Sequence, residues 1–515
     1  MTPRLDRFLT IIAQRERAML AICLLVFVAA TIVWYAGRWR RLVLWAGVGA
    51  FWLSLLGLLI INPPPPPRFT FGILINQPLW YDEAFTAIVA RLPFTQMMMA
   101  LAGDVHPPLW YLVEFVTVRV LGSSEIALRI PALLFGLAAV YLTYRLAQAS
   151  GYEQRASLLA AGLLAVMPAQ VYYSQEARMY TLLELCVLLA CVGMVERRWW
   201  AMGVGMVGAL YTHNLAVFFI IPVGAIALWR ERRYPWAVLV TGGTVILAWI
   251  PQLVLTLHQA QAIGTGYWIQ DCGLGGYILP LHNRTLGTGS AEFLQQHAAI
   301  VAVGLAVLAT WAAWRDGERG YILLTLTVAP ALLLVLVSEL WRPVYLDRAF
   351  LTSLPPLTIL VASALRRRRV WPVMDIVAAM LILCLLWQSK NAGDYYQFTR
   401  TIARQCKHGT IYHNNMASYI LSRYYVPDCN HVARPDDGSL TQALSLKTQA
   451  AMDVVRLDAA DIEEERFLVI SVETPMTTRD EIAALERTLA LGRVRQIATW
   501  ARPPLLEAGV WEVTR

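Results

Sequence analysis

Residues 126–147 read IALRIPALLFGLAAVYLTYRLA, a nearly uninterrupted apolar stretch. A helix of this length can cross a bilayer, whose hydrocarbon core needs about 20 mostly apolar residues. Comparable runs recur along the chain, so the sequence predicts a polytopic α-helical membrane protein with about 11–12 transmembrane helices. The runs lie at 19–36, 43–61, 126–147, 156–173, 179–195, 199–212, 213–229, 236–256, 298–314, 320–340, 348–365 and 371–388.

The composition agrees with a membrane protein. The chain has 515 residues, of which 57% are hydrophobic and 15% are charged, whereas soluble domains carry about 25% charged residues. The formal net charge is +8, but the chain from about Lys390 onward is close to neutral. The positive surplus therefore lies in short clusters between apolar runs. This distribution follows the positive-inside rule and argues against nucleic acid as a partner.

Basic clusters follow alternate apolar runs and mark the cytoplasmic side of the membrane. The clusters are Arg145 with Arg155, Arg197 with Arg198, Arg230 with Arg232 and Arg233, Arg315 with Arg319, and 366–369. The opposite side then receives the segment 62–125, the turns 174–178 and 212–214, the segment 257–297, the connection 338–348 and the C-terminal tail. The first run would place the arginine-bearing N-terminus outside, so its orientation stays open.

Four parts follow from this threading. Residues 1–61 hold the N-terminal spans, 62–125 form the first extracytoplasmic loop, 126–389 form the multi-span core, and 390–515 form an extracytoplasmic domain. The loop contains PLWYDEAFTAIVARL and DVHPPLWYLVEFV, which are typical of amphipathic helices at the membrane interface. The tail alternates strand and helix patterns, which predict a small α/β domain. Its Cys406 and Cys429 would pair if the domain lies in an oxidising compartment.

Two adjacent acids, Asp82 and Glu83, lie in the first predicted interfacial helix. Carboxylates near the hydrocarbon boundary are costly without partners or a function. Neighbouring helical side chains point about 100° apart, so only one of the two faces a given cavity. The functional interpretation is a general base that takes a proton from an acceptor hydroxyl. The structural alternative is a solvated helix start, where acids favour the positive end of the helix dipole.

Histidines on the predicted outer side are weaker candidates. Asp104 and His106 precede two prolines that fix the backbone at the entrance of the second interfacial helix. His106 is either a hydrogen-bond partner of an acid or a helix cap. His213, in an outer turn with Asn214, is a candidate of the same kind.

The turn YSQEARMY, at 173–180, concentrates polar residues between two apolar runs. Arg178 is a candidate for a phosphate, with Glu176 orienting it and Tyr180 lining the same site. The structural alternative is an ordinary interfacial loop with a snorkelling arginine and an aromatic belt.

Arg348 begins the apolar run 348–365, where an unpaired guanidinium would be costly. A lipid phosphate is one natural partner, and an ion pair with Asp347 or Glu339 is the structural alternative.

The sequence contains no metal or nucleotide motif. The histidines at 106, 213 and 282 are far apart and lack ligand spacing, and there is no P-loop or Rossmann glycine pattern. No metal or cofactor is therefore predicted from spacing, and a divalent ion held by Asp82 and Glu83 stays open as an alternative.

Taken together, the motifs WYDEAF, DVHPPLWY, LRIPALLFGLAAVYLTYRLA, YYSQEARMYTLL and the arginine before SLPPL resemble a known family. They are similar to the family-39 glycosyltransferases of the C-type membrane superfamily, which include protein O-mannosyltransferases and the aminoarabinose transferase acting on lipid A. The resemblance covers roughly residues 60–365. Departures are the extra N-terminal run and Ala349, which stands where many relatives have an aromatic residue.

The resemblance implies a sugar donor linked to a polyprenyl phosphate and transfer on the extracytoplasmic face. It implies that Asp82 is the catalytic base, that Glu83 is the second acid of the pair, and that Arg178 and Arg348 bind the donor phosphate. Asp104, His106, Glu176, Tyr180 and His213 would line the site. The expected location is a plasma membrane, namely a bacterial inner membrane, with the site facing the periplasm and with membrane lipids as neighbours.

The chemistry is consistent without the resemblance. A polyprenyl phosphate is a competent leaving group that needs charge stabilisation, and an acceptor hydroxyl needs a base. The acceptor, whether lipid, polysaccharide or protein, is not specified. The alternatives are a glycan or lipid carrier, which should show inverted repeats and broken helices, and a non-catalytic partner subunit.

Overall fold

The computed structural model describes residues 78–262, 305–341, 344–365, 402, 406, 409–435, 444–473, 479–502 and 506–515. All of them belong to one compact unit, Pro66–Arg515. The predicted runs 19–36, 43–61 and 371–388 and nearly all of the segment 257–297 lie outside the described residues. The boundaries of the four predicted parts stay predictions.

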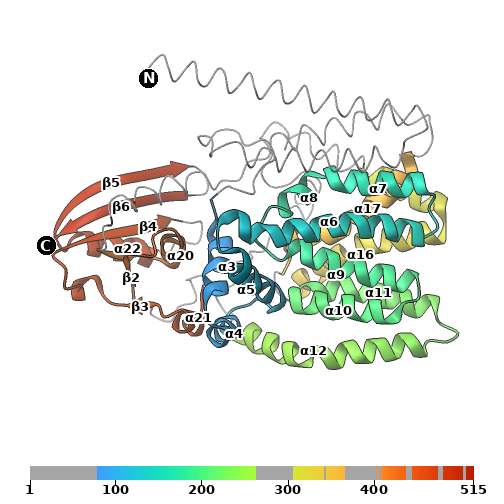
Figure 1. The fold of residues 1–515 in the computed structure, drawn as a ribbon, viewed down its shortest axis with the longest axis horizontal. Coiled ribbons are helices and arrows are strands. Elements are labelled where there is room, and N and C mark those ends of the chain that lie inside the picture. The colour runs from blue at the N-terminus through green and yellow to red at the C-terminus, as the bar shows by residue number, and fades with distance from the viewer. Residues whose placement is uncertain are drawn as a thin grey trace, which may run out of the picture. The chain divides into compact units, whose positions relative to one another are not determined.

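The described membrane region consists of helices joined by short connections (Figure 1). Its elements are α3 (Tyr81–Arg91), α4 (Phe94–Gly103), α5 (Leu109–Leu121), α6 (Glu125–Ala149), α7 (Gln154–Val166), α8 (Pro168–Tyr173), α9 (Tyr180–Val195), α10 (Trp199–Thr212), α11 (Ala216–Arg230), α12 (Trp236–Ala262), α16 (Glu318–Leu340), the 3-10 helix η1 (Asp347–Ser353) and α17 (Leu354–Leu365). A further helical stretch covers 305–316.

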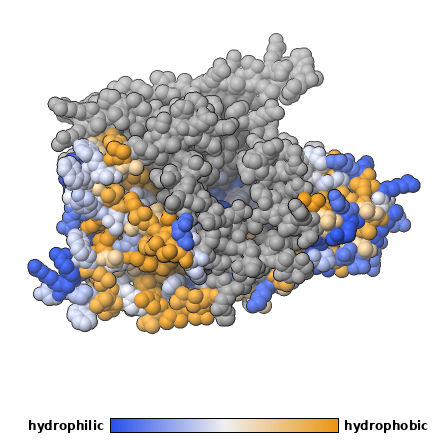
Figure 2. All heavy atoms as spheres, turned by 180° about the vertical axis from the view of Figure 1, so that it is seen from behind, coloured by the Kyte–Doolittle hydropathy of each residue, from blue (hydrophilic) through white to orange (hydrophobic). Residues whose placement is uncertain are grey.

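Among the described residues, four segments are long and apolar enough to cross a membrane. They are Glu125–Ala149, Trp236–Leu257, Glu318–Leu340 and Arg348–Leu365. Large apolar side chains such as Leu247 and Leu332 are more than half exposed, and Figure 2 shows a broad area of hydrophobic residues on the face in view. Such a surface suits lipid rather than water. The predicted class, a polytopic helical membrane protein with a small C-terminal α/β domain, is confirmed.

Two apolar runs differ from continuous α-helices. The run 156–173 is divided into α7 and α8 at Met167, whose backbone is extended (ψ 124°). The cause is Pro168, because proline disfavours the helical conformation in the residue before it. The run 348–365 begins as the 3-10 helix η1 and becomes α-helical only at Leu354. Arg348 therefore lies in a tighter helical turn than the apolar pattern predicts.

Ion pairs join several helices at the ends where the basic clusters lie. Arg145 of α6 bonds Glu196 at 2.7 Å, and Arg198 bonds the same carboxylate at 3.0 Å. Arg197 pairs with Glu231 at 2.7 Å, which links the end of α9 to the end of α11. Since α6 and α9 begin at the opposite end, the predicted extracytoplasmic turns gather on that side.

The C-terminal domain is built around a six-stranded mixed sheet in the order β3-β2-β1-β4-β6-β5 (Figure 1). The strands are β1 (Thr410–His413), β2 (Asn430–Ala433), β3 (Val455–Arg456), β4 (Arg466–Glu473), β5 (Arg493–Arg502) and β6 (Leu506–Thr514), with helices α20 (Met416–Tyr425), α21 (Leu446–Ala451), η3 (Ala459–Asp461) and α22 (Arg479–Leu489). Strand β1 is parallel to β2 and to β4. Strand β6 is antiparallel to both β4 and β5.

Alternation along β4 supplies a core on each face of the sheet. Leu468, Ile470 and Val472 belong to one buried cluster, and Phe467 and Val469 belong to another. This is the period-two pattern expected of a strand that is covered on both faces. Cys406 and Cys429 border the first cluster and form a disulfide.

The C-terminal domain contacts the interfacial helices. Helix α20 packs against α3, and α21 packs against α4. The α4 contact requires Gly103, because a Cβ there would lie 2.8 Å from the backbone nitrogen of Thr448. The hydroxyl of Thr448 also donates to the carbonyl of Ala100 at 2.9 Å. The C-terminal domain is thus joined directly to α3 and α4.

Candidate active site

Three segments that are far apart in the sequence converge on the carboxylate of Asp82. Its Oδ2 lies 3.3 Å from Nη1 of Arg348 and 3.6 Å from Nη2 of Arg178. These residues come from α3, from the turn between α8 and α9, and from η1. Asp82 keeps a quarter of its side chain exposed, whereas Arg178 is almost fully buried. One partly open carboxylate therefore meets two guanidinium groups.

Arg178 is held by a second line of contacts. Its Nη2 lies 2.8 Å from Nε2 of His106, and its Nη1 donates to the hydroxyl of Tyr111 at 3.4 Å. Burial alone would lower the pKa of Arg178, but the carboxylate of Asp82 opposes this effect and the pKa is raised overall. Arg178 therefore keeps its positive charge despite its burial.

Asp104 sets the orientation of His106. Its Oδ2 lies 2.7 Å from Nδ1 of the imidazole. Because a carboxylate only accepts and a guanidinium only donates, the ring carries its proton on Nδ1 and accepts at Nε2 from Arg178. Burial would raise the pKa of Asp104, but its interaction and hydrogen bond with His106 lower the pKa overall. Hydrogen bonds thus connect Asp104 through His106 to Arg178, which in turn pairs with Asp82.

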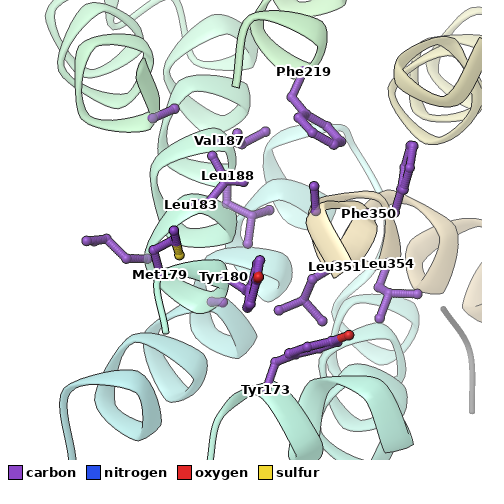
Figure 3. Packing of buried hydrophobic residues seen from close by; sticks show 14 of the residues in the cluster. Tyr173, Met179, Tyr180, Leu183, Val187, Leu188, Phe219, Phe350, Leu351 and Leu354 are labelled. Atoms are coloured by element: carbon purple, nitrogen blue, oxygen red, sulfur yellow. The ribbon is translucent and has the colours of Figure 1, made fainter. Parts of the chain in front are cut away.

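Arg348 has an aromatic and a hydroxyl partner besides Asp82. Its Cζ lies 5.4 Å from the ring centre of Trp80, and its Nη1 donates to the hydroxyl of Tyr180 at 3.3 Å. Tyr180 packs edge-on against Tyr173, with ring centres 5.1 Å apart, and both lie beside Leu351 of η1 (Figure 3). Arg348 therefore bonds a tyrosine that belongs to the buried apolar cluster.

Glu83 points away from this meeting point. It is fully buried and accepts from Nε of Arg129 at 2.7 Å and from Nη2 at 2.5 Å. It also accepts from the backbone N–H of Ala177 at 2.8 Å, and from that of Trp80 at 3.4 Å as in half of a capping box. Glu83 therefore joins α3, α6 and the turn that carries Arg178.

The remaining candidates lie nearby with different contacts. The ring centre of His213 is 6.1 Å from that of Tyr180, and its Nδ1 accepts from the backbone N–H of Leu215. Burial, together with the nearby charges of Arg178 and Arg348, lowers the pKa of His213 to about 3. Glu176 is buried, and its carbonyl accepts from the N–H of Arg178 at 2.7 Å.

The two acids of α3 do not fit a shared divalent cation. Adjacent positions direct Asp82 to the arginines and Glu83 to Arg129, so their carboxylates serve different partners. Within the part of the chain that the structure describes, no group of three or more His, Cys, Asp or Glu side chains could hold a metal ion. An arginine beside each carboxylate also disfavours a further cation there.

Three contributors to the site were not singled out from the sequence. Arg129 had a signal, because a charged residue inside the apolar run 126–147 demands a partner. Trp80 and Tyr111 were seen only as interfacial anchors. Nothing in their local sequence distinguishes an aromatic ring at the membrane boundary from one that contacts a site arginine.

The comparisons with known proteins agree with this architecture. Residues 105–254 match the family model described as dolichyl-phosphate-mannose-protein mannosyltransferase. The chain is similar to the crystal structure of ArnT from Cupriavidus metallidurans in the apo state, with a TM-score of 0.60, 12% identity, and coverage of 90% of this chain and 98% of that one. The ArnT structure bound to undecaprenyl phosphate gives a TM-score of 0.57, 13% identity and the same coverage. No curated protein sequence matches the chain.

These similarities define the class of fold. They confirm the resemblance to family-39-type C-type membrane glycosyltransferases that the motifs predict. At 12% and 13% identity, the solved structures show the shared fold over nearly the whole chain. The chemistry of this chain has to be argued from its own site.

Proposed function

We propose that the protein is a glycosyltransferase that moves a sugar from a polyprenyl phosphate to an acceptor hydroxyl at the extracytoplasmic face of the membrane. The observation that carries the proposal is the convergence of Asp82, Arg178 and Arg348. A partly open carboxylate beside two arginines, at the membrane boundary, combines a base with an anion site.

The arginines would bind the donor phosphate. Arg178 is buried, and its Nε has no hydrogen-bond acceptor among the described residues. A buried donor without a partner is costly, and a phosphate oxygen would satisfy it. Arg348 bonds the hydroxyl of Tyr180, which belongs to the apolar cluster of Figure 3, so a lipid phosphate at Arg348 would lie beside apolar side chains.

Asp82 would act as the general base. Its Oδ2 faces both arginines, and no described residue hydrogen-bonds its Oδ1. The acceptor oxygen attacks the anomeric carbon while the bond from that carbon to the phosphate oxygen breaks. Asp82 takes the hydroxyl proton, and the polyprenyl phosphate leaves with one more negative charge than in the donor. Arg178 and Arg348 would stabilise that charge as it develops.

Two further features belong to the proposal. Transfer would proceed with inversion at the anomeric carbon, because direct displacement needs only one carboxylate at the reacting centre and Glu83 is committed to Arg129. The site would face the periplasm of a bacterial inner membrane, because it lies at the opposite helix ends from the arginine clusters.

Glu83 takes a different part in the proposal from the one expected of it. Its contacts with Arg129 and with the amide of Ala177 make it a positioning residue that fixes α3 relative to Arg178. Tyr180 would orient Arg348, and His106 with Asp104 would orient Arg178.

The test is transfer of radiolabelled sugar from polyprenyl-phosphate donors, with lipid, polysaccharide and protein acceptors offered in purified membranes. Labelled product is expected from the wild type, and its anomeric configuration by NMR should be opposite to that of the donor. Retained configuration would refute inversion. No transfer with any donor and acceptor would refute the proposed function and favour the carrier or partner subunit.

A further inference from the structure

A short backbone segment, Pro78 to Trp80, leads directly into the helix that carries Asp82. Each of its residues uses a backbone polar group in a specific contact. The carbonyl of Pro78 accepts from Nη2 of Arg129 at 3.3 Å, and the N–H of Trp80 donates to Glu83 at 3.4 Å. These two contacts come from the membrane region itself.

The backbone contact of the middle residue, Leu79, is made by the C-terminal domain. The N–H of Leu79 donates to the phenol oxygen of Tyr425, the last residue of α20, at 2.7 Å. Leu79 is fully buried, so its N–H has no access to water as a substitute. Burial, and then the charge of Glu125, raise the pKa of Tyr425, which therefore stays an uncharged phenol.

A second tyrosine, Tyr424, anchors the same end of α20 through contacts with Ser123 and Arg91. Tyr424 packs edge-on against Tyr425, with ring centres 4.7 Å apart, and its hydroxyl donates to the carbonyl of Ser123 at 2.6 Å. The guanidinium of Arg91 lies 4.6 Å from the ring centre of Tyr424. Tyr424 therefore serves docking of the domain, whereas Tyr425 bonds the strip of backbone next to the site.

We propose that Tyr425 is a positioning residue for the transfer reaction and that the C-terminal domain is in this way part of the active-site assembly. The inference rests on the proposed function for its catalytic consequence. By fixing the backbone at Leu79, Tyr425 sets the position of the next residue, Trp80, whose indole lies against Arg348. The same residue precedes the first turn of α3, where Asp82 stands.

A single hydrogen bond joins Leu79 to the C-terminal domain. Loss of the phenol oxygen leaves a buried N–H without its acceptor, which the segment can relieve only by shifting. A shift of about 1 Å at a positioned group is enough to reduce a rate strongly. Binding of the donor lipid should be less affected, because Arg178 is also held by His106 and Tyr111, and Arg348 is also held by Tyr180.

The experiment compares Tyr425→Phe with Tyr424→Phe, which are matched losses of one hydroxyl from neighbouring residues. Tyr425→Phe should lower kcat for sugar transfer roughly three- to tenfold with little change in the KM for the donor. Tyr424→Phe should leave kcat within about twofold of the wild type. Equal effects of the two substitutions, or an unchanged kcat in Tyr425→Phe, would overturn the proposal.

Hydrogen–deuterium exchange separates this inference from the proposed function. In Tyr425→Phe, a peptide that contains Leu79 should exchange faster than in the wild type, and in Tyr424→Phe it should not. This readout needs no catalytic activity. Wild-type protein without transferase activity would refute the proposed function, whereas unchanged exchange at Leu79 would refute the role of Tyr425.

Discussion

Neutralising Glu83 should destabilise the protein more than neutralising its neighbour Asp82. Glu83→Gln removes the charge that faces Arg129 in a fully buried pair and weakens the acceptor for the amide of Ala177. Breaking one partner of a buried ion pair costs about 3–5 kcal/mol. Asp82→Asn removes the charge of a side chain that is a quarter exposed, and the buried Arg178 keeps its contacts with His106 and Tyr111. Its cost in stability should therefore be smaller than that of Glu83→Gln, about 1–2 kcal/mol.

The assay is thermal unfolding of the purified protein in detergent, followed by intrinsic fluorescence or by loss of the monodisperse species. Glu83→Gln is expected to lower Tm by several degrees, and Asp82→Asn is expected to lower Tm by clearly less. Arg129→Gln combined with Glu83→Gln should recover part of the loss, because no buried charge then lacks its partner. A Tm for Glu83→Gln equal to that of the wild type would refute the structural role of the pair.

Three further outcomes follow from the same contacts. Asp104→Asn should reduce the kcat of transfer about tenfold or more, because the amide no longer fixes the His106 tautomer that accepts from Arg178. An unchanged kcat would contradict the role of these two hydrogen bonds. Because burial lowers the pKa of His213 to about 3, the unfolded state binds more protons between pH 6.5 and 3, so this histidine should cost about 2 kcal/mol of stability between pH 6.5 and 5. His213→Gln should accordingly flatten the dependence of Tm on pH in that window, and an equal slope would argue against a buried neutral imidazole. Transfer should persist in a chelator, because the two acids of α3 have separate partners; loss of activity that added Mg²⁺ or Mn²⁺ restores would contradict this.

The helical part of the fold was largely accessible from hydropathy and charge. Bounds such as those of α6 and α10 follow the apolar runs closely, because a bilayer admits only helices that satisfy their own backbone groups. The break at Pro168 was also available from the sequence, since proline restricts the residue before it. The start of η1 was not, because a 3-10 turn and an α-turn bury similar apolar patterns.

The C-terminal domain was predicted in part. The stretches GTIYH, NMASYILSRYY, RFLVISV, TRDEIAALERTLALG and VRQIATW have strand or helix patterns and coincide with β1, α20, β4, α22 and β5, whereas the sequence analysis names no pattern for β2, β3 or β6. Strand β3 has two residues, and β2 has four, which is too short for alternation to stand out. Their places depend on pairing with β1, which only the tertiary fold supplies.

The candidate site shows the same limit. Asp82, Arg178 and Arg348 were selected by residue type, by their predicted side of the membrane and by the family resemblance. Their meeting at one carboxylate oxygen depends on helix packing across 266 residues of sequence. Tyr425 carried no sequence signal, because its partner is a backbone N–H that lies 346 residues away.

The most direct test of the account is sugar transfer by Asp82→Asn beside Asp428→Asn, an exposed aspartate of the C-terminal domain. Both proteins should fold, insert and still bind the polyprenyl phosphate of the proposed reaction, so that a loss of rate reports on chemistry. We expect Asp428→Asn to transfer normally and Asp82→Asn to lose at least about 100-fold in kcat, as the removal of a general base does. Transfer by Asp82→Asn at the wild-type rate would contradict the assignment of Asp82 as the base.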